Sequence, residues 1–201
     1  MATKKIANPQ DIYQIKVTLL GTKPPIWRRL LVSTAMTLAQ LHDVLQIAMG
    51  WQNCHMHEFR IGRRYFGRPS PEERLMGVTP TEDERKVSLS ALLGKIGAKL
   101  TYTYDMGDSW EHSIVLEKGI PADPAAQYPA CIAGQLACPP EDCGGIPGYY
   151  HLLEAIEDRN HPQHDELYEW VGEHYDPRIF SVDKINGRLA RTSQSKKSRQ
   201  R

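Results

Sequence analysis

Apolar residues at every second position are the feature that most constrains what this chain can fold into. In residues 12–20 the apolar side chains alternate with polar ones and fall at Tyr13, Ile15, Val17 and Leu19. A period of two places successive side chains on opposite faces, so this pattern predicts a half-buried strand. Glycine and proline break the pattern after residue 20. Further strands are expected at residues 26–32, 55–61, 100–105 and 110–116.

Helical patterns lie between and after these strands. Thr37 is a suitable N-cap for a helix that ends at Gly50, and Gln40 completes a capping box three residues after the cap. Shorter helices are expected at residues 88–93, 149–157, 165–173 and 181–189. This order predicts an α+β fold, with a mixed sheet of hairpins, one capped central helix and a C-terminal group of short helices.

The length of 201 residues fits one domain. We expect a single α+β domain over residues 11–190, after a flexible N-terminus at residues 1–10 and before a disordered basic tail at residues 191–201. Residues 67–86 and 119–148 are rich in loop-forming residues and are interpreted as long loops. A loop as long as the second one is usually functional or held by a ligand.

Charge and hydropathy indicate the cellular compartment of the protein more clearly than its function. The chain has 25 Lys and Arg residues against 24 Asp and Glu residues, so its net charge favours no polyanionic partner. No stretch is long and apolar enough to span a bilayer, and residues 1–10 contain no apolar signal core. We therefore expect a cytoplasmic protein without a membrane partner, whose four cysteines are reduced thiols or metal ligands.

Three of the cysteines fall in the second predicted loop. Cys131, Cys138 and Cys143 follow one another with gaps of six and four residues. With one histidine they would complete a tetrahedral zinc site, and a structural zinc would hold the loop in order. The gaps are wider than the two-residue spacing of most zinc knuckles. The alternative is that the three thiols are small buried apolar groups.

A second cluster lies at the end of the predicted hairpin. Asp105 closes one strand, Asp108 lies in the turn, and His112 begins the return strand. Carboxylates and an imidazole gathered there would bind a divalent ion or act as acid and base. The alternative is turn chemistry, in which the aspartates bond to the backbone and His112 is a core residue.

Two further groups are candidates for assisting that cluster. His55 and His57 would share one face of the predicted strand at residues 55–61 and reach one ligand. Glu141 and Asp142 lie in a rigid turn that prolines precede and glycines follow, and the two acids would act as ligands or a general base. The alternatives are two partly exposed histidines and a pair of acids that cap the following helix.

The basic tail is the feature that favours nucleic acid. Its cations are Arg191, Lys196, Lys197, Arg199 and Arg201. Such a tail would add affinity that depends on salt and not on base sequence, although a merely solvating terminus is the alternative. No phosphate-binding loop, dinucleotide fingerprint, nucleophile elbow or zinc-finger pattern occurs in the chain.

Four ordered motifs resemble those of a known family. They are AMGW (48–51) with HMHEF (55–59), YTYDMGDSWEH (102–112), YPAC (128–131) with ACPPEDCGG (137–145) and GY (148–149), and YDP (175–177) with Phe180 and Asn186. Together they resemble the plasmid pRiA4b ORF-3-like family, whose members also carry the label of insertion-element passengers, TnpR-like by name. The resemblance covers residues 10–190 and implies an α+β domain, but no particular activity.

Two functions follow as expectations. The first is an interaction module associated with plasmids or mobile elements, which binds nucleic acid through its tail, or a protein partner, and holds a structural zinc. The alternative is a metal-dependent hydrolase of phosphoesters that uses the Asp105, Asp108 and His112 cluster.

Overall fold

A computed structural model describes residues 11–70 and 80–198, with the side chains of the last helix described as far as Thr192. The strands of this part are β1 (Asp11–Leu19), β2 (Trp27–Ser33), β3 (His57–Ile61), β4 (Arg64–Gly67), β5 (Glu82–Asp83), β6 (Lys99–Tyr104), β7 (Trp110–Pro121) and β8 (Ala130–Gln135). They form one sheet in the order β5-β4-β3-β6-β7-β1-β2-β8. Only the pairing of β4 with β5 is parallel within this sheet, so the sheet is mixed.

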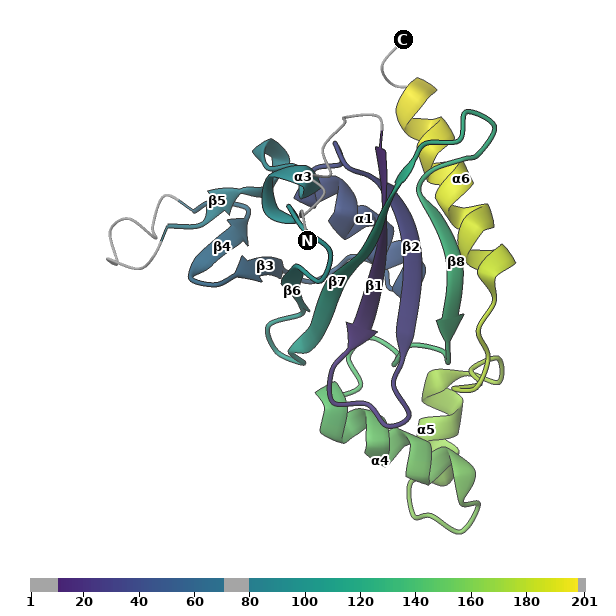
Figure 1. Cartoon of the computed structure of the whole chain (residues 1–201). Helices are drawn as coiled ribbons and strands as arrows, with labels where there is room; N and C mark the ends of the chain where they lie inside the picture. The colour runs from purple at the N-terminus through teal and green to yellow at the C-terminus, as the bar shows by residue number, and fades with distance from the viewer. Residues whose placement is uncertain (1–10, 71–79, 199–201) are drawn as a thin grey trace.

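The helical elements are α1 (Leu38–Met49), the 3-10 helix η1 (Glu84–Lys86), α3 (Leu89–Leu92), α4 (Gly145–Glu157), α5 (His164–Val171) and α6 (Val182–Ser198). Helix α1 crosses one face of the sheet, and α6 packs beside it against β8 and α1 (Figure 1). Helices α4 and α5 pack on one another below the turn between β1 and β2. The arrangement confirms the predicted α+β class.

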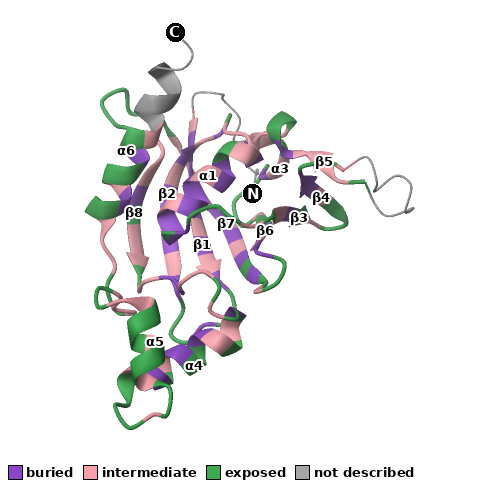
Figure 2. Cartoon of the chain, turned by 180° about the vertical axis from the view of Figure 1, so that it is seen from behind, coloured by how far each residue is buried: buried purple, intermediate pink, exposed green. Residues whose placement is uncertain are grey.

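Alternation along β1 produces the core as expected. Tyr13, Ile15, Val17 and Leu19 are all buried, and α1 adds Leu38, Leu41 and Leu45 from the helix side. Figure 2 shows this buried band running between the sheet and α1. The capping box is confirmed, because the Thr37 side chain accepts from the Gln40 amide and the Gln40 side chain accepts from the Thr37 amide. Gly50 ends the helix in the left-handed region at φ 92°.

Several predicted boundaries were wrong. Strand β3 begins at His57, so His55 lies in the preceding loop. Residues 119–148 contain the end of β7 and all of β8, because β8 adds to the edge of β2. Residues 67–86 contain β5 and η1, and their middle, at 71–79, lies outside the described residues.

The last helix also differs from the expectation. Helix α6 continues to Ser198, whereas the sequence pattern placed its end at Leu189 and a disordered tail from residue 191. The predicted flexible N-terminus at 1–10 and the last three residues lie outside the described part of the chain. None of the described helices combines the length and apolarity needed to cross a membrane.

Candidate functional site

Three segments that are distant in the sequence meet where β6 and β7 join. They are the loop between α1 and β3, the turn between β6 and β7, and the turn that precedes α4. Trp51 Nε1 donates to Pro139 O at 3.0 Å, which joins the first segment to the third. Asp108 Oδ2 accepts from the Gly144 amide at 3.2 Å, which joins the second to the third.

Each segment carries a non-glycine residue in the left-handed region. They include Asn53 at φ 61°, Asp105 at φ 58° and Asp142 at φ 60°. Asn and Asp tolerate this conformation better than other residues, but it still costs on the order of 1 kcal/mol at each position. Such conformations persist where the surrounding structure holds them, and they gather at functional sites.

One nitrogen and two carboxylate oxygens converge at this junction. His55 Nε2 lies 3.1 Å from Asp142 Oδ1 and 3.6 Å from Asp105 Oδ2. The Nε2 atom is buried and makes no hydrogen bond in the described structure, because neither carboxylate meets it with hydrogen-bond geometry. Donor atoms of His55, Asp105 and Asp142 all lie within 4.8 Å of one another.

The separation of these atoms suits a shared metal ion. Zinc binds histidine nitrogen and carboxylate oxygen at about 2.0–2.2 Å, so two ligands of one ion lie about 2.9–3.6 Å apart for angles between 90° and tetrahedral. The distances of 3.1 Å and 3.6 Å from His55 Nε2 to the two carboxylate oxygens lie within this range. A buried imidazole nitrogen without a hydrogen bond is the group that such an ion would satisfy.

The turn between β6 and β7 fixes Asp105 with its own backbone. Asp105 Oδ1 accepts from the amides of Gly107 at 2.9 Å and Asp108 at 3.3 Å. The other carboxylate oxygen, Oδ2, faces His55. The turn interpretation of Asp105 is therefore confirmed for one oxygen, and the other oxygen lies in the donor group, where metal binding stays a prediction.

A second donor group adjoins the first through the same histidine. Cys54, His55 and Glu141 also hold donor atoms within 4.8 Å of one another, and Cys54 Sγ lies 3.5 Å from Glu141 Oε1. Desolvation and the Glu141 carboxylate raise the pKa of the Cys54 thiol. At neutral pH the thiol is therefore protonated, and a bound cation would be needed to make it a thiolate ligand.

The hydroxyl of Tyr104 organises the two loops around these donors. It donates to Glu141 Oε1 and accepts from the amides of Cys54 at 3.1 Å and His55 at 3.3 Å. Glu141 Oε2 in turn accepts from the amide of Gln52 at 2.9 Å. Burial and the bond to Glu141 raise the pKa of Tyr104, so the hydroxyl stays protonated as a donor.

The structure separates His57 from His55, contrary to the predicted shared ligand. His57 Nε2 lies 2.7 Å from Glu84 Oε2, and both side chains are buried. The His57 ring stacks on His42 with centroids 3.5 Å apart. Burial, and then the charge of His57, lower the pKa of His42 to about 4. His57 therefore belongs to a buried polar pair, because β3 begins there and turns its side chain toward η1.

The predicted cluster of Asp105, Asp108 and His112 is not assembled. His112 is fully buried in the core, where its Nδ1 lies 3.2 Å from Tyr102 O. Burial lowers the pKa of His112 to about 4, which keeps it neutral. Asp108 bonds to the Gly144 amide, so of the three residues only Asp105 reaches the donor group.

Glu141 and Asp142 do not cap α4 in the manner expected as an alternative. The helix begins at Gly145 with Gly144 as N-cap and without a side-chain cap. Glu141 instead bonds to the first loop, and Asp142 faces His55. Asp142 lies in the donor group, as one of the two acids that the sequence offered as ligands. Cys54 and Tyr104 are residues of this junction that the sequence did not single out.

The three cysteines of the predicted zinc site do not form a donor group among the described residues. Cys131 Sγ lies 3.5 Å from Ala133 O, within β8. Cys138 Sγ lies 3.1 Å from Met49 Sδ, under the end of α1. Burial raises the pKa of all three thiols, for Cys143 to about 12. Cys131 and Cys138 are buried, in line with the alternative of buried apolar groups, whereas Cys143 is half-buried.

The basic residues that were predicted to bind nucleic acid lie on α6 or after it. Arg191 is exposed on α6, and Lys196 and Lys197 lie on the same helix. Arg199 and Arg201 lie outside the described residues. The end of α6 extends away from the sheet in Figure 1.

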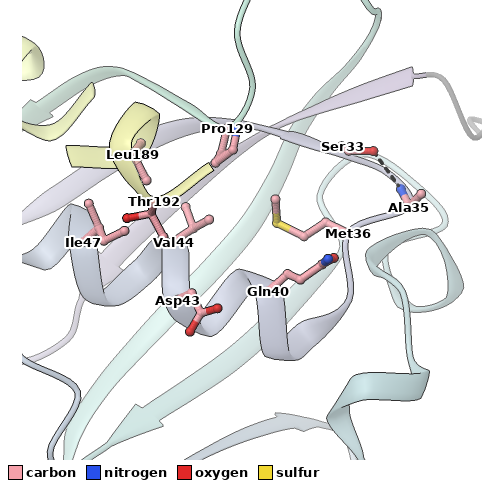
Figure 3. Close-up of a pocket in the computed structure, with 10 residues that line it drawn as sticks. All are labelled: Ser33, Ala35, Met36, Gln40, Asp43, Val44, Ile47, Pro129, Leu189 and Thr192. Carbon is pink, nitrogen blue, oxygen red and sulfur yellow. Dashed lines mark hydrogen bonds between the residues drawn. The ribbon is translucent and has the colours of Figure 1, made fainter. Parts of the chain in front are cut away.

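A cavity of about 430 Å³ is lined by residues of α1, of α6 and of the β2–α1 connection. In Figure 3, Val44 and Ile47 of α1 face Leu189 and Thr192 of α6 across it, with Met36 at its other end. Its polar lining includes Gln40 and Asp43. The cavity would bury an apolar group, and none of the metal-donor groups of the described residues lies in it.

The fold and the junction together define a class: an α+β domain with a mixed sheet and a donor group where β6 joins β7. The chain belongs to the plasmid pRiA4b ORF-3-like family, whose model matches residues 11–184. This confirms the resemblance read from the four motifs.

The chain is also similar to two particular proteins. It is 41% identical over 178 residues to an uncharacterized protein, y4hQ, of Sinorhizobium fredii (strain NBRC 101917 / NGR234), covering 88% of this chain and 89% of the relative. It is also similar to the crystal structure of MM3350, a protein of unknown function from Methanosarcina mazei Go1. That similarity has a TM-score of 0.79 and 32% identity over 88% of this chain and 98% of the other.

Proposed function

We propose that this protein is a binding module that holds one divalent transition-metal ion with His55, Asp105 and Asp142. The buried, unbonded His55 Nε2 beside two carboxylate oxygens is the observation that carries the proposal. One nitrogen with two oxygens suits zinc, manganese or iron better than magnesium, which prefers oxygen alone. Cys54 and Glu141 lie beside this set and would supply further ligands.

Calorimetric titration of metal-free protein with zinc tests the proposal. We expect about one equivalent per chain, and a loss of affinity of at least about tenfold in His55→Ala and Asp142→Asn, because the first change removes a ligand and the second replaces a carboxylate with a neutral amide. Asp165→Asn is the matched control, since Asp165 is an exposed acid outside both donor groups. Cys131→Ser should also bind normally. Equal affinity in all variants would refute the assignment, and loss only in Cys131→Ser would restore the cysteine zinc site.

The hydrolase is the second candidate, with a changed set of residues. Three protein ligands leave a fourth position for water, and Asp142 is exposed, so this position would face solvent. Hydrolysis of bis(p-nitrophenyl) phosphate by the zinc- or manganese-loaded protein tests it. Activity that disappears in His55→Ala and persists in Asp165→Asn would support a phosphoesterase, and absence of turnover with both metals would leave a binding module alone.

Nucleic-acid binding remains a separate proposal, which fits a cytoplasmic role linked to plasmids or mobile elements. It is supported by α6, which carries its cations on a projecting helix, and by four free cysteines, as expected in the cytoplasm. Removing residues 190–201 should weaken DNA binding and flatten its dependence on salt, because each lost phosphate contact lowers the log–log slope by about 0.9. A full-length protein that is not retained on DNA at low salt would contradict it.

A further inference from the structure

A second cavity, distinct from the metal-donor junction, lies where the end of α1, the β8–α4 connection and the start of α6 meet. Its volume is about 190 Å³, which is roughly six water volumes. Three of its lining residues are cations, and none is an acid. The cations are Arg28 of β2 and Lys184 and Arg188 of α6.

Arg28 is a buried cation that has no anionic partner among the residues that the structure describes. Its residue is only 2% exposed. Nε donates to Ala48 O, Nη1 donates to the carbonyls of Trp27 and Gln135, and Nη2 donates to Cys138 Sγ at 3.2 Å. These bonds use four of its five N–H donors, and in the described part of the chain no carboxylate pairs with it.

The neighbours of Arg28 do not supply the missing charge. Burial raises the pKa of Cys138, so the thiol that accepts from Nη2 is neutral. Phe180 stacks on the guanidinium with its ring centroid 4.7 Å from Cζ. A buried charge is normally balanced by a counter-charge as well as by hydrogen bonds. Among the described residues, no group supplies this counter-charge.

We propose that this cavity binds a small organic oxyanion, whose charged group faces Arg28 and whose apolar part lies against Ile179 and Phe180. Lys184 and Arg188 are exposed on α6 and hold the outer side of the anion. The cavity is smaller than a pocket for a drug-sized ligand, which fits a phosphate or carboxylate with one short or flat substituent. This assignment does not depend on the metal site.

Calorimetry with phenylphosphate and inorganic phosphate tests the proposal on the full chain. Because Arg28 also ties β2 to α1, the test uses the exposed pair Lys184→Gln/Arg188→Gln, with Arg191→Gln as control on the same helix and outside the cavity. We expect one phenylphosphate per chain, bound more tightly than phosphate. The double variant should bind about fivefold more weakly, and the control should bind as the parent does.

A second measurement places the anion inside the cavity. Phenylphosphate should shift the nuclear magnetic resonance signal of the Arg28 Nε–H, because the anion would contact the same guanidinium. No saturation at roughly 10 mM probe would overturn the site. Equal affinity in the double variant and the control, or an unmoved Arg28 signal, would also overturn it. Equal affinity for the two probes would contradict the apolar part of the assignment.

Discussion

At the scale of single residues, Tyr104 shows how a buried hydroxyl can position a site that it does not join. Its side chain comes from β6, and its hydroxyl contacts the backbone of one loop and the carboxylate of another. The donor residues therefore depend on a group whose own place is set by the sheet. Buried polar groups of this kind are costly to leave unpaired, which makes the arrangement specific.

Tyr104→Phe tests this positioning role. The change leaves the Cys54 and His55 amides and one Glu141 oxygen without their partner, so the free energy of unfolding should fall by about 1–3 kcal/mol. Zinc affinity should fall by about 10- to 100-fold, as for other groups that hold metal ligands. Denaturant unfolding and calorimetry measure the two effects. Tyr168→Phe is the control on an exposed tyrosine, and an unchanged affinity in Tyr104→Phe would argue against the role.

The buried histidines predict how stability changes with pH. Burial lowers the pKa of His112 from 6.5 to about 4, so the unfolded chain takes up a proton at a higher pH than the folded one. Stability should therefore fall as the pH drops from 6.5 to 4, by about 3 kcal/mol for this group. His42 acts in the same direction, since its pKa is also lowered to about 4.

Unfolding free energies of the parent and His112→Phe, measured between pH 4 and 7, check this effect. Within that window, the slope of the unfolding free energy against pH should be smaller in the variant by about 1.4 kcal/mol per pH unit, because one titrating group is removed. Parallel curves for the two proteins would mean that His112 does not titrate between the folded and unfolded states.

At the scale of elements, glycines at the start of α4 bring it against the β6–β7 turn. Gly145 has φ +66°, and a Cβ there would lie 2.6 Å from Asp108 O. Gly62 has φ +58° with nothing within 4 Å of such a Cβ. Both glycines therefore have a left-handed backbone, but only at Gly145 would a Cβ collide with another part of the chain.

Gly145→Ala and Gly62→Ala separate these two causes. Both should lose about 1 kcal/mol from the left-handed backbone. Gly145→Ala should lose a further 1–3 kcal/mol or so, because the Asp108 carbonyl must move. Gly145→Ala should also weaken zinc binding, since Asp105 belongs to the same β6–β7 turn as Asp108. Equal losses measured by thermal unfolding would show that the contact between the two turns is not tight.

Local patterns predicted the elements that local forces build. The alternation in β1, the capping box of α1 and the hairpin of β6 with β7 can all be read within short windows of sequence. Strand β8 was missed because it is an edge strand whose pairing with β2 is a long-range contact. Its Gly134 also leaves no room for a Cβ beside Phe180, which lies far along the chain.

The candidate site could be predicted only in parts, for the same reason. Residue chemistry pointed separately to His55, to Asp105 and to the pair of Glu141 and Asp142, and each lies at the junction. Their meeting depends on contacts such as Trp51 with Pro139 that no local pattern contains. Cys131, Cys138 and His112 also carry ligand atoms, but the fold buries them outside both donor groups.

At the scale of the whole molecule, the sheet and α1 form the frame, and three connections at one end carry the donors. The donors His55, Asp105 and Asp142 come from different connections, so the site exists only in the folded chain. Metal binding should therefore stabilise the folded state by mass action. The oxyanion cavity lies at the junction of α1 with α6 and would be independent of that effect.

The most direct test of the account is anomalous X-ray diffraction at the zinc edge from crystals of the full chain grown with zinc. We predict one strong peak within about 2.0–2.2 Å of His55 Nε2, Asp105 Oδ2 and Asp142 Oδ1. A map without a peak at this junction, or with its peak at Cys131, Cys138 and Cys143, would contradict the proposed site.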